Sequence, residues 1–257
     1  MNSLNYKDNN IDTNNNNNTT SLKSNSKSDD DTSPENVFIL PPSKQKYDLC
    51  FKIIVIGNCG VGKTSLTYQA VQEKFSTAYH STVGLDFFTM FLKIEDKIIK
   101  LQIWDTCGQE VYRSLVKNFY RDASLALMVY SIDDEKSFQD IDLWIKELKT
   151  CSNPDSKMIL IGNKSDLENR QITYEIGKSF AKDYDFVDFL ETSAKTGYNA
   201  KEVFIKSTKI LYNNYKKYEE IKQEPSDGSY SSYTKRKPRY SRRLDVYKNI
   251  SSGCCHS

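Results

Sequence analysis

The feature that most constrains the fold is an apolar segment that runs directly into a glycine-rich loop and then into a helical pattern. Residues 51–56 read F-K-I-I-V-I, which is typical of a buried parallel strand. Residues 57–64 read G-N-C-G-V-G-K-T and match the pattern G-x-x-x-x-G-K-[ST], and a helical pattern covers residues 64–74. Such a loop wraps its backbone N–H groups around phosphate, and the helix N-terminus adds partial positive charge. The sequence therefore predicts a phosphate-binding loop, with a chance glycine-rich turn as the alternative.

Strand and helix patterns alternate along the middle of the chain. The strand patterns cover residues 51–56, 85–94, 98–104, 125–132, 158–162 and 186–191. The helical patterns cover residues 64–74, 137–150, 174–183 and 199–217. Because the connections are short, this alternation predicts a three-layer α/β domain at residues 47–217, with a mostly parallel six-stranded sheet flanked by helices.

Composition separates this domain from two polar tails. The 257 residues are 38% hydrophobic and 27% charged, and the mean hydropathy of −0.64 is too polar for a chain that is folded throughout. Residues 1–46 are rich in Asn, Ser, Thr and Asp and are predicted to be a disordered extension. Residues 218–257 carry a basic cluster among Ser, Pro and Gly and are predicted to be a flexible tail.

The sequence argues against several classes of protein. Four of the six cysteines stand apart from one another, so a disulfide framework is not expected. We find neither a signal-peptide pattern nor about 18 consecutive apolar residues that could span a bilayer. The second residue is Asn2 rather than the glycine of N-myristoylation. The two histidines lie far apart, so a histidine-based site is not expected either.

A second motif indicates which base the phosphate loop serves. Residues 163–166 read N-K-S-D and follow the predicted strand 158–162, at the sheet edge where ligands bind in such folds. The carboxylate of Asp166 can accept from the ring N–H and the exocyclic amine of guanine, and adenine has no such pair of donors. Lys164 can lay its methylene stem across the base. Together with S-A-K at residues 193–195, this motif predicts GTP or GDP as the bound nucleotide.

Further residues predict magnesium binding and hydrolysis. Lys63 is expected to reach the β- and γ-phosphates, and the Thr64 hydroxyl is expected to bind Mg²⁺. Residues 105–109 read D-T-C-G-Q after the predicted strand 98–104. Asp105 is placed to hold Mg²⁺ through water, the Gly108 N–H to contact the γ-phosphate, and Gln109 to orient the attacking water as the catalytic residue. Thr82 is the candidate for a second hydroxyl on Mg²⁺, with a plain surface threonine as the alternative.

Together these motifs resemble those of the Ras-superfamily small GTPases, and the flanking residues resemble the Rab branch. The Rab-like stretches are S-T-V-G-L-D-F at 81–87, K-L-Q-I-W at 100–104, Y-R-S-L at 112–115 and E-T-S-A-K-T-G at 191–197. The resemblance covers residues 47–217 and the C-terminus. It implies a P-loop GTPase fold, switch segments around Thr82 and after Gly108, and packing of Phe75 against guanine. The predicted nucleotide-binding set is Gly57, Asn58, Cys59, Gly60, Val61, Gly62, Lys63, Thr64, Ser65, Phe75, Thr82, Asp105, Gly108, Asn163, Lys164, Asp166, Ser193, Ala194 and Lys195.

Some positions depart from the usual Rab pattern. Cys107 stands where the family usually has alanine, Ser131 where it has aspartate, and F-Y-R-D-A at residues 119–123 where it has Y-Y-R-G-A. None of these changes removes a catalytic group, so GTP hydrolysis is still expected. Cys59 lies where bulk beside the γ-phosphate can affect the rate. Intrinsic turnover is expected to be slow, about 10⁻⁴ to 10⁻² per second, and stimulated in trans.

The last four residues read C-C-H-S. The resemblance implies geranylgeranyl groups on Cys254 and Cys255, and two chains give stable anchoring where one is marginal. A single-lipid C-a-a-X signal fits poorly because Cys255 and His256 are not aliphatic, and two idle thiols are the remaining alternative. A basic cluster precedes them, which either attracts anionic lipid or forms a nuclear or RNA-binding patch: Lys235, Arg236, Lys237, Arg239, Arg242 and Arg243.

These observations predict a membrane-anchored switch that alternates between GTP and GDP, recruits effectors in its GTP form and regulates vesicle trafficking. The expected location is the cytoplasmic face of an intracellular or plasma membrane, with a cytosolic pool. The resemblance implies an exchange factor, a GTPase-activating protein, effectors, a prenylation escort protein and a dissociation inhibitor as partners. No nucleic-acid partner is expected. The rival interpretations are a nucleotide-stabilised scaffold that does not hydrolyse GTP and a Ras-type protein with one prenyl group.

Overall fold

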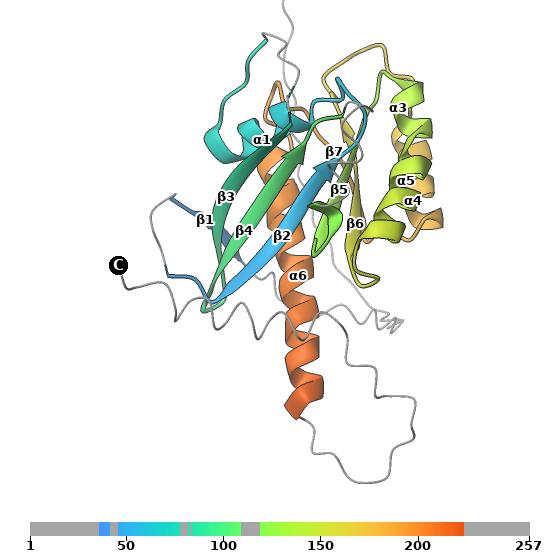
Figure 1. Ribbon diagram of the computed structural model, residues 1–257. Coiled ribbons are helices and arrows are strands. Elements are labelled where there is room, and N and C mark those ends of the chain that lie inside the picture. The colour runs from blue at the N-terminus through green and yellow to red at the C-terminus, as the bar shows by residue number, and fades with distance from the viewer. Residues whose placement is uncertain (1–35, 42–45, 78–81, 83, 109–118, 224–257) are drawn as a thin grey trace, which may run out of the picture. The chain divides into compact units, whose positions relative to one another are not determined.

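The computed structural model describes residues 36–41, 46–77, 82, 84–108 and 119–223 (Figure 1). The described strands are β1 (Val37–Leu40), β2 (Leu49–Ile56), β3 (Leu85–Ile94), β4 (Lys97–Thr106), β5 (Leu125–Ser131), β6 (Lys157–Asn163) and β7 (Asp188–Glu191). The described helices are α1 (Lys63–Gln72), α3 (Glu135–Gln139), α4 (Ile141–Cys151), α5 (Tyr174–Asp183) and α6 (Ala200–Gln223). The helices lie on both faces of the sheet, so the predicted three-layer α/β fold is confirmed.

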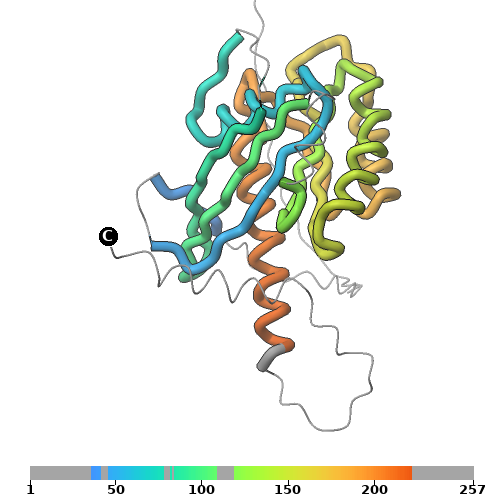
Figure 2. The backbone as a smooth tube through the Cα atoms, viewed as in Figure 1, coloured from blue at the N-terminus to red at the C-terminus, as the bar shows by residue number. Residues whose placement is uncertain are grey.

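The sheet has the order β1-β3-β4-β2-β5-β6-β7. β3 runs antiparallel to β4 and to β1, and the other neighbouring strands are parallel to one another. The prediction of a mostly parallel sheet is therefore correct, whereas the count of six strands is wrong by one. The seventh strand is β1, which lies at the outer edge of the sheet beside β3 (Figure 2).

The folded domain extends beyond the predicted residues 47–217 at both ends. β1 lies inside residues 1–46, where disorder was expected, because four apolar residues pair with β3 from Val37 opposite Ile94 to Leu40 opposite Phe91. At the other end, α6 continues beyond residue 217 to Gln223. Tyr218, the first residue beyond the predicted end, packs on the core. Both segments are short and lie in polar surroundings, so the composition of the sequence did not predict that they belong to the folded domain.

Two hydrophobic cores fill the space between the layers. One lies under α1 and α6, with Leu66 and Phe204 among its buried members, and the other lies under α4 and α5, with Trp144 and Ala181. The parallel strands are buried on both faces, which explains why β5 is apolar almost throughout and has no exposed residue. These two cores fix the sheet, and with it the loops at the carboxyl ends of its parallel strands.

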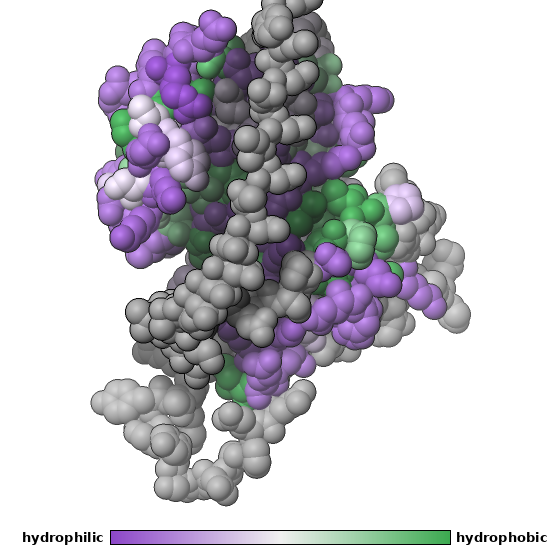
Figure 3. Space-filling model, turned by 180° about the vertical axis from the view of Figure 1, so that it is seen from behind, coloured by the Kyte–Doolittle hydropathy of each residue, from purple (hydrophilic) through white to green (hydrophobic). Residues whose placement is uncertain are grey.

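Seen from behind, the coloured surface is largely hydrophilic and includes a continuous hydrophobic area (Figure 3). Phe38 and Ile39 of β1 are among the large hydrophobic residues that are exposed. Within the described ranges, no helix combines the length and the apolar composition that a membrane span requires.

Candidate functional site

The loops at the carboxyl ends of the parallel strands border a cavity of about 1120 Å³. Its lining comes from the phosphate loop with the start of α1, from the segment after α1, and from the loops that follow β6 and β7. The predicted nucleotide-binding residues that line it are Cys59, Gly60, Gly62, Lys63, Thr64, Ser65, Phe75, Thr82, Asn163, Lys164, Asp166, Ala194 and Lys195. Segments that are more than a hundred residues apart in the sequence therefore share one cavity.

Lys63, the first residue of α1, is a buried cation at the bottom of the phosphate loop. Its side chain is 5% exposed, and its Nζ atom donates hydrogen bonds to the carbonyl oxygens of Gly57 and Asn58 over 2.9 and 2.7 Å. Burial lowers the pKa of Lys63 to about 8, and the nearby carboxylate of Asp105 opposes this shift. Two neutral carbonyl groups compensate a buried ammonium only in part, so this position favours an anionic ligand.

Three side-chain oxygens meet next to this lysine. The Thr64 hydroxyl lies 2.5 Å from Oδ2 of Asp105 and 2.6 Å from the Thr82 hydroxyl. Oδ1 of the buried Asp105 has no hydrogen-bond partner among the described residues. Burial raises the pKa of this carboxyl group to about 7, while the hydrogen bond from Thr64 and the charge of Lys63 lower it and Asp86 raises it further.

This oxygen cluster fits Mg²⁺. Magnesium prefers oxygen ligands, commonly one or two carboxylates completed by phosphate and water, and two hydroxyls with one carboxylate match that preference. In the described part of the chain, no group of three or more His, Cys, Asp or Glu side chains could hold a metal. The cluster of Thr64, Thr82 and Asp105 is of a different kind because it contains a single carboxylate. A cation there would compensate Oδ1 of Asp105, which none of the described residues contacts by a hydrogen bond.

On the opposite side of the cavity, Asn163 connects two loops. Its Nδ2 atom donates to the carbonyl oxygen of Val61 over 2.9 Å, and its Oδ1 atom accepts from the Thr192 hydroxyl and the Ala194 N–H over 3.0 and 3.3 Å. The side chain approaches the loop so closely that a Cβ atom at Gly62, where φ is +92°, would lie 2.4 Å from Nδ2 of Asn163. Asn163 is fully buried, and its hydrogen bonds to both loops fix the phosphate loop relative to the loop after β7.

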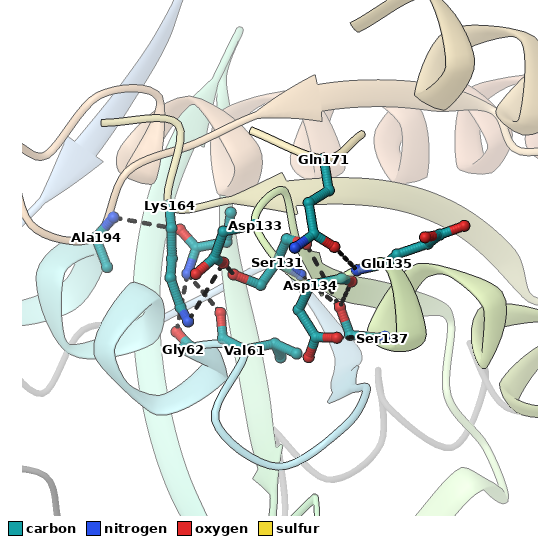
Figure 4. Close-up of polar contacts among 11 residues, drawn as sticks. Val61, Gly62, Ser131, Asp133, Asp134, Glu135, Ser137, Lys164, Gln171 and Ala194 are labelled. Carbon is teal, nitrogen blue, oxygen red and sulfur yellow. Dashed lines mark hydrogen bonds and ion pairs between the residues drawn. The ribbon is translucent and has the colours of Figure 1, made fainter. Parts of the chain in front are cut away.

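Asp166 and Lys164 complete this side. Oδ1 of Asp166 accepts a hydrogen bond of 2.6 Å from the Ser193 hydroxyl, and Oδ2 lies 3.8 Å from Nζ of Lys195. Nζ of Lys164 lies 3.6 Å from Oδ1 of Asp133, and Figure 4 shows these two side chains next to each other. The carboxylate of Asp166 is therefore oriented by the serine of the S-A-K stretch, and both cations on this side face a carboxylate.

The other predicted site residues have different positions. Phe75 is 40% exposed and borders the cavity. Gly108 packs so tightly on the phosphate loop that a Cβ atom there would lie 2.4 Å from the backbone of Asn58 and Cys59. Asn58 does not line the cavity, and its side chain bonds to other groups. Gln109, the lipidation candidates Cys254 and Cys255, and the basic cluster of the tail lie outside the described residues.

Two further residues at the site are not among those that the sequence predicts. Tyr68 lines the cavity one helical turn after Thr64, and its place on the same helix face could have indicated this. Asp133, which faces Lys164, had no local signal. Of the positions that depart from the Rab pattern, Cys107 is buried in the core under α4, and the hydroxyl of the buried Ser131 donates to Asp133.

The fold and this cavity define a P-loop nucleotide-binding protein of the GTPase type, with an oxygen cluster on one side and a carboxylate held by serine on the other. The family model described as the Ras family matches residues 52–213, which is more than half of the chain, and the chain belongs to this family. Members of the family are small nucleotide-binding switches that generally bind guanine nucleotide and Mg²⁺, hydrolyse GTP, and interact with exchange factors, GTPase-activating proteins and effectors.

Proposed function

We propose that this protein is a Rab-like GTPase switch and that lipids on Cys254 and Cys255 attach it to a membrane. The meeting of Thr64, Thr82 and Asp105 is the observation that carries the switch. Thr82 is 18 residues away from Thr64 and lies in neither a helix nor a strand, so its position depends on the site rather than on a regular element. A γ-phosphate with Mg²⁺ would favour this arrangement, and its loss would release the segment around Thr82.

The proposed base-recognition residues are Asp166, Lys164 and Phe75. Asp166 keeps acceptor capacity beyond its bond from Ser193, because an ionised carboxylate has about four lone-pair sites. It would accept from the ring N–H and the exocyclic amine of guanine, while Lys164 and Phe75 would pack on the faces of the base. A site built on such bonds rejects adenine because its own polar groups would be left unpaired.

Hydrolysis is proposed as attack of water on the γ-phosphate, which breaks the bond to the bridging oxygen and yields GDP and inorganic phosphate. Thr64, Thr82 and Asp105 would hold Mg²⁺, which when bound offsets negative charge on the phosphate oxygens. Lys63 would bind the β- and γ-phosphates, and Gln109 would orient the attacking water. Single-turnover hydrolysis of GTP by the purified protein tests this step, with Gln109→Leu as the variant that should be slower without any activating protein. Equal rates would remove Gln109 from the mechanism, and no turnover would favour a binding scaffold.

The Rab-like stretches and the paired cysteines support a role in vesicle trafficking on the cytoplasmic face of a membrane. The proposed partners are an exchange factor, an activating protein and effectors, together with an escort protein for prenylation and a dissociation inhibitor. The intact mass of the protein from cells tests the anchor directly, because two geranylgeranyl groups, one group and none give three distinct masses. One group would favour a Ras-type anchor, and none would leave the basic cluster as the candidate membrane contact.

A further inference from the structure

The side chain of Asn58, the second residue of the phosphate loop, is bound by one residue at the junction of α3 and α4 and by one residue of α4. Its Nδ2 atom donates to Oδ2 of Asp140 over 2.8 Å, and its Oδ1 atom accepts from Nε1 of Trp144 over 2.9 Å. Asp140 is the residue between the two helices, and Trp144 lies in α4. Both partners are buried, at 8% and 2% exposed. These contacts link the loop to residues more than eighty positions away in the sequence.

The two partners dictate the chemistry of the side chain between them. An indole N–H can only donate and an ionised carboxylate can only accept, so the connecting group must accept on one side and donate on the other. The amide of Asn58 does both. An aspartate of the same size would still accept from Trp144, but it would place a second carboxylate against Asp140.

The backbone of Asn58 supports two parts of the proposed active site. Its carbonyl oxygen accepts the 2.7 Å hydrogen bond from Nζ of Lys63. The same peptide is where Gly108 packs, since a Cβ atom on Gly108 would lie 2.4 Å from its carbonyl carbon and 2.5 Å from its oxygen. A change in the side-chain bonds of Asn58 therefore reaches the ammonium group that is proposed to bind phosphate, and it reaches Gly108, the residue directly before the second switch segment.

We infer that Asn58, Asp140 and Trp144 form a clamp that holds the phosphate loop on α4 and controls how fast guanine nucleotide dissociates. The inference rests on the proposed nucleotide-binding function and adds positioning residues to it, because none of the three side chains lines the cavity. Lys136 extends the clamp to the surface, where its side chain is 72% exposed and its Nζ atom lies 2.6 Å from Oδ1 of Asp140.

The test is the release of a fluorescent GDP analogue from the full-length protein into excess unlabelled GDP with Mg²⁺ present. Asn58→Asp should release the nucleotide about tenfold faster, because a buried hydrogen bond is replaced by charge repulsion. Asp140→Asn alone should change release only about threefold, since the amide oxygen still accepts from Asn58. The double variant Asn58→Asp/Asp140→Asn exchanges donor and acceptor and should return to within about twofold of wild type. Trp144→Phe, which removes only the indole side of the clamp, should release about fivefold faster.

Two controls separate positioning from general destabilisation. Asp142→Asn removes a carboxylate of α4 that pairs with Lys146 at the surface, and release should stay at the wild-type rate. Leu148→Ala opens the buried side of α4 without touching the loop, so it should lower the melting temperature but not speed release.

The clamp is refuted if Leu148→Ala releases GDP as fast as Asn58→Asp, or if the double variant is no slower than Asn58→Asp. If the single aspartate variant does not fold, Trp144→Phe and the double variant still decide. Failure of the wild type to bind GDP would instead overturn the proposed function.

Discussion

The two sides of the cavity differ in how well their polar groups are satisfied. On the side of the N-K-S-D motif, Asn163 bonds to two loops at once and Asp166 accepts from Ser193. On the phosphate-loop side, the ammonium of Lys63 bonds only to backbone carbonyls in the described contacts, and one oxygen of Asp105 has no hydrogen-bond partner among the described residues. On the first side, Asn163 and Asp166 form their hydrogen bonds within the protein itself. On the second side, burial disfavours the charged forms of Lys63 and Asp105.

The pKa values on the phosphate side express the same difference. Burial lowers the pKa of Lys63 to about 8 and raises that of Asp105 to about 7, so in each case the neutral form gains weight. A phosphate beside the lysine and a divalent cation beside the carboxylate would both favour the charged forms. We conclude that the base side is preorganised for selectivity, while the phosphate side depends on its ligands and can respond to their loss.

The largest effect is expected when the base side loses its carboxylate. Asp166→Asn should weaken GDP binding by about three orders of magnitude, because two charge-assisted hydrogen bonds to guanine are lost. Oδ1 can still accept from Ser193, so the loop should keep its conformation. Xanthine nucleotides should regain affinity, since their oxygen accepts from the new amide where guanine presents an amine. Competition binding with GDP and XDP measures this, and an unchanged preference for GDP would disprove the role of Asp166 in base recognition.

On the phosphate side, the expected effect of losing one magnesium ligand is about a hundredfold in affinity for GTP with Mg²⁺. Thr64→Asn should show this loss, whereas Thr64→Ser keeps the hydroxyl and should bind nearly as well as wild type. Removal of Mg²⁺ with EDTA should affect the wild type strongly and Thr64→Asn little, because the variant has already lost the metal-dependent part. Isothermal titration with and without EDTA separates these cases. An equal response of both proteins to EDTA would mean that Thr64 does not bind the metal.

The parts of the two sides that consist of short motifs with fixed spacing can be predicted from the sequence. The loop of residues 57–64 and the N-K-S-D motif each lie within one short segment, next to a strand whose apolar character is plain. Pairings such as Trp144 with Asn58, which are 86 residues apart, depend on helix packing and leave no local pattern. The additional strand β1 was not predicted because its four apolar residues lie in a polar segment. Fold class is therefore predictable from periodicity, whereas the residues that support the site become visible only in the folded chain.

A smaller effect is expected from the connection between the two sides. Asn163→Ala leaves the Val61 carbonyl, the Thr192 hydroxyl and the Ala194 N–H without their partner in a buried place. The free energy of unfolding should fall by about 2 kcal/mol, and GDP should dissociate roughly tenfold faster. Asn153→Ala is a matched control, because its side-chain oxygen is buried without a hydrogen-bond partner in the described structure. Denaturant unfolding in saturating GDP and stopped-flow release provide the two values, and equal losses in both variants would contradict the linking role.

The smallest effect should come from the ion pair of Lys164 with Asp133. Its atoms are 3.6 Å apart and its side chains are 35% and 21% exposed, so water screens the attraction and the pair contributes about 0–1 kcal/mol. Asp133→Asn keeps the size of the side chain and an oxygen that can accept from Ser131, and it should speed GDP release about two- to threefold by freeing the lysine stem that is proposed to cover the base. The difference from wild type should vanish in about 1 M NaCl, where charges are screened over roughly 3 Å. Asp155→Asn, at an exposed turn before β6, should not change release at either salt concentration. A tenfold effect that persists at high salt would mean that Asp133 belongs to the satisfied, preorganised side of the cavity rather than to its solvent-exposed border.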